Sequence, residues 1–371
     1  NNVIDMIPAR DSAEYADFSP ADAAWFRGLL DWADAHRELL RHTRTIIGQP
    51  ALGRVDGTAA VIGDSGAVFL FNPNARPMTA EFTLDSTIGL AADRGQALEL
   101  RELYPRADMR VGKPDAGLWR YGDRVSIPMD GASAVVLEVR PFDAAMGQTL
   151  LYGAPGQASA DLSAITLDHV TGEPGTTAQL LVKLPAGAVP APERATVNGV
   201  PVPVHRVRPD LAALDVRFAG AEFRQLQQVG TYDPAFAGGT WRGSFTVPQR
   251  VFDQLAARQR AWPIPWTAED YETTWLAPQR LLLYVQIAEP DDRWEARMQI
   301  DGREIELRKA YSAVRVVHRT FTGFYADVSL LAAGREHAVE LTLPALRPGQ
   351  FQGLFFVNVA PDYTDAIVRT P

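Results

Sequence analysis

The sequence predicts a mainly β protein, with tandem antiparallel β-sandwich domains, one N-terminal helix and a C-terminal jelly roll. Three observations predict this fold class. One segment near the start has apolar residues at helical spacing. From residue 51 onward the apolar period is two for most of the chain. The predicted strands are short and separated by Gly and Pro turns, which is typical of sandwiches and jelly rolls.

The helix is predicted over residues 20–47, in "FSPADAAWFRGLLDWADAHRELLRHTRTIIG". Ser19 suits the N-cap, Pro follows at the first helical position, and a Gly-Gln-Pro stretch ends the pattern. Trp25 and Trp32 are seven residues apart and therefore share one face. That face is either a platform for a ligand or, as we favour, a packing surface for a neighbouring element.

Changes in pattern divide the chain into four parts. Residues 1–48 form the helical segment. Residues 49–143 read as one antiparallel β-domain, and a Gly-rich linker leads to a small β-sandwich over 148–228. Residues 229–371 form the last block, which reads as the jelly roll.

The composition narrows the classes of partner. The chain has 371 residues, 46% of them hydrophobic and 22% charged, which is the balance of a folded soluble protein. A net charge of -9 without a basic stripe disfavours nucleic acid and anionic membranes as partners. No apolar run has the roughly 18 residues of a membrane helix. With no cysteine and six scattered histidines, we expect no metal and no cofactor.

Aromatic residues concentrate in the last block, which holds five of the eight tryptophans, at positions 241, 262, 266, 275 and 294. Flat rings cover the apolar faces of a sugar, and neighbouring acids bond its hydroxyls. The predicted carbohydrate-binding residues are Trp241, Trp262, Trp266, Asp270 and Tyr271. The alternative is that these rings seal the end of the sandwich.

Catalytic residues are not identifiable. With 45 acids, carboxylate pairs are too common for spacing to select one, and no nucleophile elbow is present. Asp291 and Asp292 could bind a sugar hydroxyl or calcium, although an exposed Pro-Asp-Asp turn is favoured. Asp327 is expected to accept hydrogen bonds from backbone N–H groups around Leu330 and Leu331.

Four segments of the last block follow one another in the order of strands and turns known from a family of domains. They are "TWLAPQ", "RLLLYVQIAEP", "ARMQIDGREIEL" and "FTGFYADVSLLAAGREHAVELTLP". Residues 238–360 resemble the galactose-binding-like jelly roll, in particular the sugar-binding domain of glycoside hydrolase family 2. Asp301-Gly302 stands where that family usually has Asn-Gly. The resemblance covers turns and core strands and implies no catalytic motif.

The helix followed by "GAVFLFNPNARP", "LRELYP" and "VSIPMDGASAVVLEVRP" is similar to the C-terminal β-domain that follows a (β/α)8 barrel in many glycoside hydrolases. On that resemblance the helical segment is the end of a barrel, the start of the chain is a cut, and an extracellular or periplasmic location is favoured. The expected function is the C-terminal, non-catalytic portion of a glycoside hydrolase, supporting the barrel and binding an oligo- or polysaccharide.

Whether this chain is itself an enzyme stays open, because the catalytic acids would lie in an N-terminal domain or a companion chain. The alternative is a stand-alone carbohydrate-binding or scaffold protein without activity. The helix distinguishes them. An exposed face at Trp25, Leu29 and Trp32 favours barrel docking, whereas a face covered by residues 51–142 favours the binding protein.

Overall fold

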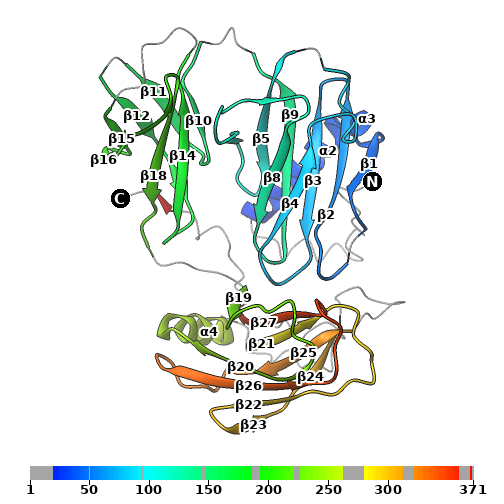
Figure 1. Cartoon of the computed structure of the whole chain (residues 1–371). Helices are drawn as coiled ribbons and strands as arrows, with labels where there is room; N and C mark the ends of the chain where they lie inside the picture. Colours follow the sequence, from blue (N-terminus) through cyan, green and yellow to red (C-terminus); the bar gives the residue numbers. More distant parts are fainter. Residues whose placement is uncertain are drawn as a thin grey trace.

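The structure is a computed structural model that describes residues 20–49, 51–93, 95–143, 147–161, 163–185, 193–220, 226–261, 280–311, 321–358 and 368–369. Three β units follow one another along the chain, two side by side and the third below them in Figure 1. We call them the first unit, the middle unit and the C-terminal sandwich. The predicted mainly β fold class with antiparallel β-sandwiches is confirmed, because antiparallel sheets dominate the described ranges.

The first unit consists of two short helices, a seven-stranded sheet and a two-stranded ribbon. The sheet has the order β1-β2-β3-β9-β5-β6, with β7 also paired to β5, and β4 pairs with β8. Its elements are α2 (Pro20–Ala35), α3 (Arg37–Leu40), β1 (Thr43–Ile47), β2 (Asp56–Ile62), β3 (Ser65–Asn72), β4 (Met78–Thr83), β5 (Ala97–Tyr104), β6 (Met109–Val111), β7 (Trp119–Arg120), β8 (Arg124–Met129) and β9 (Ser133–Pro141).

The predicted helix is correct up to Leu40 and wrong beyond it. Residues Thr43–Ile47 form β1, which pairs antiparallel with β2 at one edge of the sheet. The sequence there is Thr-Arg-Thr-Ile-Ile, and four of its five side chains are β-branched, which favours a strand over a helix. The apolar residues at 46 and 47 therefore belong to the sheet.

The core of the first unit lies between the seven-stranded sheet and the ribbon. Leu70, Leu100 and Leu137 from the sheet meet Phe82 and Ile127 from the ribbon in one buried cluster. The opposite, outer face of the sheet carries the alternate residues of the same strands. This outer face positions the polar cluster described below.

The middle unit is a small two-sheet sandwich. Its sheets have the orders β10-β14-β18-β17 and β11-β12-β15-β16, and β12 pairs with β15 in parallel, unlike the antiparallel arrangement expected. β13 pairs with β28 near the C-terminal end. The strands are β10 (Leu150–Tyr152), β11 (Gln157–Ala160), β12 (Ile165–Asp168), β13 (Thr171–Gly172), β14 (Thr177–Lys183), β15 (Ala195–Val197), β16 (Val200–Val202), β17 (His205–Arg208), β18 (Leu211–Arg217) and β28 (Val368–Arg369).

The C-terminal sandwich packs a five-stranded sheet, β19-β27-β21-β25-β24, on a four-stranded sheet, β20-β26-β22-β23. Its elements are β19 (Leu226–Val229), β20 (Gly239–Thr246), α4 (Gln249–Ala261), β21 (Leu281–Ile287), β22 (Arg297–Ile300), β23 (Arg303–Ile305), β24 (Arg308–Tyr311), β25 (Phe321–Asp327), β26 (Glu336–Leu343) and β27 (Phe351–Asn358).

Two local features of this sandwich follow from its sequence. Asp301 and Gly302 both have positive φ, 52° and 76°, as the tight turn between β22 and β23 requires. Helix α4 was not predicted. Val251 and Leu255, four residues apart, face the sandwich core and fix α4 against it.

None of the helices in the described ranges is long and apolar enough to cross a membrane.

Candidate functional site

The predicted carbohydrate site falls largely outside the described residues. Trp262, Trp266, Asp270 and Tyr271 all lie between positions 261 and 280, where the structure gives no description. Sugar binding by these four residues therefore stays a prediction.

Trp241, the fifth predicted residue, lies in β20 within the C-terminal sandwich. Its side chain is 7% exposed, and its ring centroid is 6.1 Å from that of Phe351. Gly230 and Gly243 leave space for the indole, because a Cβ at either position would approach the ring to within 2.7 and 2.3 Å. Trp241 therefore packs in the core, and a role in sugar binding for it also stays a prediction.

A polar cluster centred on Glu99 lies on the outer face of the seven-stranded sheet. Leu98 and Leu100 of β5 point into the core, so Glu99 between them points to the outer face. The β5–β9 register places Glu99 opposite Arg140, and β6 brings Arg110 alongside. Glu99 is only 5% exposed, so its charge needs partners.

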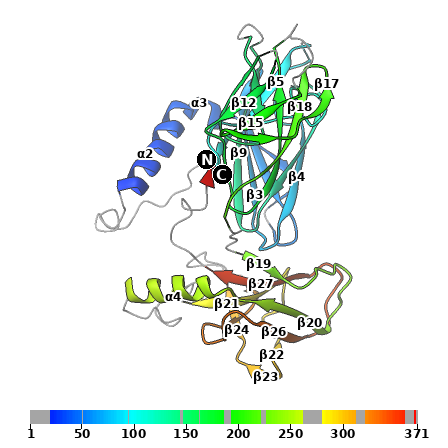
Figure 2. The ribbon, with the colours of Figure 1, turned by 90° about the vertical axis from the view of Figure 1, so that its left-hand side faces the viewer.

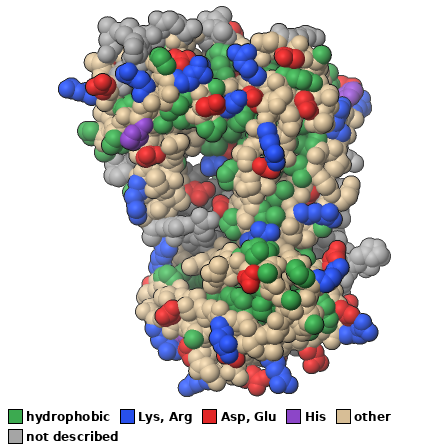
Figure 3. Space-filling view, in the orientation of Figure 1, with side chains coloured by type: hydrophobic (Ala, Val, Ile, Leu, Met, Phe, Trp, Pro, Cys, Tyr) green, Lys and Arg blue, Asp and Glu red, His purple; other side chains and the backbone are tan. Residues whose placement is uncertain are grey.

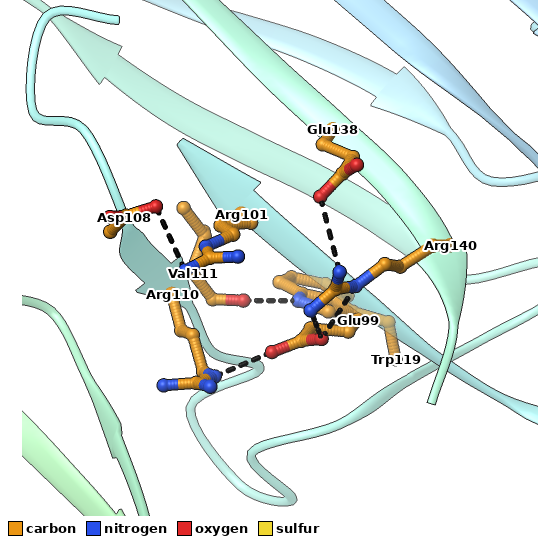
Figure 4. Close-up of polar contacts among 8 residues, drawn as sticks. All are labelled: Glu99, Arg101, Asp108, Arg110, Val111, Trp119, Glu138 and Arg140. Atoms are coloured by element: carbon orange, nitrogen blue, oxygen red, sulfur yellow. Dashed lines mark hydrogen bonds and ion pairs between the residues drawn. The ribbon is translucent and has the colours of Figure 1, made fainter. Parts of the chain in front are cut away.

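Two arginines supply those partners (Figure 4). One carboxylate oxygen of Glu99 accepts a hydrogen bond from Arg110 Nε, and the other accepts two from Arg140, at 2.9 Å from Nε and 2.8 Å from Nη2. Glu138 adds a weaker ion pair to Arg140 at 3.7 Å. Beside them the Trp119 indole donates to the Val111 carbonyl oxygen at 2.7 Å, which fixes β6 against β7.

These contacts decide the protonation state of Glu99. Burial alone would raise its pKa, but the hydrogen bonds and charges of Arg140 and Arg110 outweigh burial and lower the pKa. Glu99 is thus a carboxylate with both oxygens occupied. It has no proton to give as a general acid and no free oxygen to attack a substrate, so the cluster serves to hold strands together.

The cluster adjoins the junction with the middle unit. Tyr152 of β10 is 2% exposed, and Gly112 is packed so closely against it that a Cβ there would lie 2.8 Å from its ring. The Gly153 N–H donates to the Arg110 carbonyl oxygen at 3.0 Å. Within the described residues the Tyr152 hydroxyl has no hydrogen-bond partner, and its pKa is raised by burial first and by Glu99 second.

Another part of the outer face carries a different buried acid. Asp56 and Thr58 of β2 lie on the same face as Ala60, which packs with Phe69. Asp56 is 8% exposed, and burial raises its pKa. The Thr58 hydroxyl is buried and lacks a partner among the described groups. These two polar side chains are costly to bury and find little local compensation.

Helices α2 and α3 cover only part of that face. Trp32, Leu39 and Leu40 pack against Phe69 and its neighbours. The N-terminal half of α2 extends away from the sheet, as Figure 2 shows. Trp25 is 58% exposed, and Leu29 on the same helical face is partly buried. The face shared by Trp25 and Trp32 is therefore covered at one end and open at the other.

Two acids of the C-terminal sandwich that the sequence singled out, Asp291 and Asp327, are engaged within their own turns. The Asp291 carboxylate accepts hydrogen bonds from Arg293, which lower its pKa, so the turn role favoured for it holds. Asp327 caps its own turn as expected, although the donor is the Ser329 N–H, at 2.9 Å, and not Leu330 or Leu331. In the described ranges no three His, Asp or Glu side chains gather as a metal site.

The Glu99 cluster was missed in the sequence, although a signal for it exists. In "ALELRELY" the residue that alternates with two core leucines is an acid, and an acid at a half-buried strand position requires cations nearby. Arg110 and Arg140 lie in the neighbouring strands β6 and β9. Pairing them with Glu99 needs the strand register, which the sequence alone does not provide.

Comparison with known proteins gives little further information. No family model matches the chain, and no curated protein matches it. Solved structures with similarity include BuGH86wt in complex with neoagarooctaose, at 8% identity and a TM-score of 0.18 over 81% of this chain. Another is BpGH86A, a beta-porphyranase of glycoside hydrolase family 86 from the human gut bacterium Bacteroides plebeius, at 11% identity and a TM-score of 0.17 over 87% of this chain.

This chain spans about a third of those proteins, 33% of the first and 37% of the second. At these identities and TM-scores the likeness is too small to assign a fold or a function to it.

Proposed function

We propose that this chain is the C-terminal, non-catalytic portion of a glycoside hydrolase, which supports an upstream catalytic domain and binds carbohydrate. The first unit would carry the contact with the upstream domain. The C-terminal sandwich would act as the galactose-binding-like, sugar-binding module, with Trp262, Trp266, Asp270 and Tyr271 as its binding residues.

The observation that carries this proposal is the open half of helix α2. Trp25 is a large apolar side chain, exposed by 58%, near the start of a helix whose other end is anchored through Trp32. Tryptophan is enriched in protein–protein interfaces, so this exposed indole supports a contact surface at this end of the helix. The buried and poorly compensated Asp56 and Thr58 lie on the same side of the sheet.

The described acids support a non-catalytic role. Glycoside hydrolysis needs two carboxyl groups about 5–9.5 Å apart, one with a raised pKa to protonate the leaving group. Among the acids in the described ranges, the pKa is clearly raised for Asp56 alone. The pKa values of Glu99 and Asp301 are instead lowered by their hydrogen-bond partners. Asp56 lies on the outer face of the sheet, which α2 and α3 cover in part, and no second acid with a raised pKa is found in the described ranges.

Carbohydrate binding is consistent with the surface charge. On the face seen in Figure 3, Lys and Arg are interspersed with Asp and Glu, and no large patch of one sign is present. Such a surface suits a neutral, hydroxyl-rich ligand better than a polyanion.

Isothermal titration calorimetry tests sugar binding. The full chain is titrated with a panel of neutral oligosaccharides that includes neoagarooctaose, beside a Trp262→Ala/Trp266→Ala variant and a matched Trp25→Ala control. We expect binding heat and a fluorescence change for at least one sugar, both lost in the double variant and kept in the control. No heat and unchanged fluorescence across the panel would reject carbohydrate binding.

Hydrogen–deuterium exchange tests the contact with an upstream domain. Exchange of Pro20–Ala35 amides is compared between this chain and a longer product that includes the sequence encoded before it. Slower exchange in α2, with unchanged exchange in β21, supports docking. Equal exchange in α2 would contradict it.

The alternative, a stand-alone carbohydrate-binding or scaffold protein, is favoured by one observation. Trp32, Leu39 and Leu40 are already covered by the sheet, as that reading expects. An upstream reading frame without a barrel, together with sugar binding by this chain, would select it.

A further inference from the structure

The loop after β3, residues Asn72 to Arg76, is held in one shape by its own side chains. Asn72 is 1% exposed, and its amide donates to the carbonyl oxygens of Arg76 at 2.9 Å and Asp130 at 2.7 Å. Asn74 is fully buried, donates to the Arg54 carbonyl oxygen at 2.8 Å and accepts from the Gly53 N–H. A loop with this many satisfied amides is preorganised for a contact.

The tip of this loop packs on the outer face of the five-stranded sheet of the C-terminal sandwich. Ala75 is 3% exposed and packs with Leu282, Tyr284 and Phe355, on the side of the five-stranded sheet that faces away from the sandwich core. Its N–H donates to Oε1 of Gln286 at 2.9 Å. Gln286 is 3% exposed, so this hydrogen bond joins two buried groups more than 200 positions apart.

Charged and polar contacts surround the tip. Arg76 Nε donates to Gln352 Oε1 at 3.2 Å, and the guanidinium carbon lies 4.5 Å from the centroid of the Tyr232 ring. Gly53 is so near that a Cβ there would lie 3.1 Å from Gln352 Nε2. The contact therefore has an apolar centre, one buried hydrogen bond and a polar rim, which is the anatomy of a specific interface.

Glycine supports the loop from the other side. A Cβ at Gly131 would lie 2.0 Å from the Ala75 carbonyl oxygen, so no larger residue fits while the loop stays in place. Gly131 belongs to the turn between β8 and β9, which also supplies the Asp130 carbonyl oxygen to Asn72. The shape of the loop thus depends on two turns of the first unit, the loop itself and the turn between β8 and β9.

If the C-terminal sandwich swung freely on a linker, this face of β21 and β27 would open to water. Leu282, Tyr284, Phe355 and Val357 would then lose the Ala75 contact that covers part of them. Exposing adjoining apolar side chains is unfavourable, and the rim contacts would be lost with it.

We propose that the Asn72–Arg76 loop stays bound to the outer face of the five-stranded sheet. This intramolecular contact joins the C-terminal sandwich to the first unit as one rigid body. The partner of this sheet face is thus a segment of the same chain. Because the loop covers this face of the five-stranded sheet, a carbohydrate must bind another surface of the C-terminal sandwich, for example the four-stranded sheet or one end of the sandwich.

Distance measurement by electron spin resonance tests the proposal. The chain has no cysteine, so Thr79→Cys in β4 and Arg303→Cys in β23, both at exposed positions, take spin labels uniquely. In this otherwise unchanged chain we expect one narrow distance distribution. A broad distribution would by itself overturn the proposal, because independent modules sample many separations.

Substitutions in the labelled chain then locate the contact. Ala75→Arg puts a long cation into the buried site, and Gln286→Leu removes the acceptor of the Ala75 N–H, so both should broaden the distribution. Ala75→Gly keeps the N–H and should leave it narrow. Gln299→Leu, the same exchange at an exposed position of β22, is the matched control.

Circular dichroism separates loss of docking from loss of folding. If Ala75→Arg does not fold, Gln286→Leu and the unsubstituted labelled chain still decide the result. A folded Ala75→Arg variant that keeps the narrow distribution would show that the loop does not hold the two units together. Sugar binding is not needed for any of these outcomes, so failure of the proposed function leaves this test intact.

Discussion

The indole of Trp32 meets the ring of Phe69 edge-on, with ring centroids 6.4 Å apart and an interplanar angle of 78°. This contact joins the last turn of α2 to β3, and the sheet supports α2 only near this end. Seven residues earlier Trp25 has no such cover. Two tryptophans on one helical face therefore have opposite environments.

Substitution of these tryptophans should separate the two environments. Trp32→Ala is expected to lower the free energy of unfolding by about 2–3 kcal/mol, because it removes a large ring from a half-buried contact. Trp25→Ala, the matched control, should change it by less than about 0.5 kcal/mol. Urea denaturation of both variants measures the difference. Equal losses would mean that Trp25 is also packed in solution.

Removing the charge of Glu99 should weaken the first unit. Glu99→Gln leaves Arg110 and Arg140 without their shared carboxylate and is expected to cost about 2 kcal/mol. Because the folded-state pKa of Glu99 is lowered, its contribution is full above the unfolded pKa and is lost as pH falls through the folded pKa. The difference in free energy of unfolding between Glu99→Gln and wild type should therefore become smaller at acidic pH.

Denaturant titrations at neutral and acidic pH check this prediction for Glu99. Glu138→Gln is the control, because Glu138 contacts the same Arg140 from 3.7 Å at a more exposed position. A Glu99→Gln variant as stable as wild type at pH 7 would contradict the structural role of the cluster.

Asp56 should behave in the opposite way. Its pKa is raised by burial, so the folded state binds the proton more tightly than the unfolded state, and stability falls as pH rises through the folded pKa. Asp56→Asn should therefore raise the melting temperature at pH 7. The gain should disappear below the unfolded pKa of about 3.9. A loss of stability at pH 7 would indicate that the carboxylate has a partner there.

The Tyr152 hydroxyl offers a further test. It is buried at the junction of the first and middle units without a hydrogen-bond partner among the described groups. Tyr152→Phe keeps the ring between Gly112 and Gly117 and removes only the unsatisfied oxygen, so stability should stay equal or rise by up to about 1 kcal/mol. Thermal unfolding measures it. A loss above about 1 kcal/mol would point to a bound water.

The sequence predicted much of the fold because alternation is a local signal. Strands such as "RVSIPM" and "HAVELTLP" alternate cleanly in burial, and the Asp301-Gly302 turn has its expected geometry. An error occurred where two local signals conflict. Thr43–Ile47 continues a helical apolar pattern, but its β-branched residues favour a strand, and pairing with β2 selects the strand.

The site was less predictable, because its contacts join residues that are distant in the sequence. Asn72 and Asn74 read as an ordinary loop, and nothing local shows that Ala75, which follows them, contacts Gln286. Glu99 likewise needs the register of β5 with β9 before Arg140 becomes its partner. Contacts between units depend on packing across the whole chain, which apolar periodicity does not encode.

The parallel pairing of β12 with β15 affects how the middle unit folds. Ile165 meets Ala195 only after the intervening chain has crossed to the other sheet as β14 and returned. Hairpins such as β11–β12 and β15–β16 can close early from neighbouring residues, but the pair that joins them must wait for a long loop to close. We therefore expect this unit to reach its native state slowly and in one cooperative step, with the joining of two preformed hairpins as the kinetic barrier.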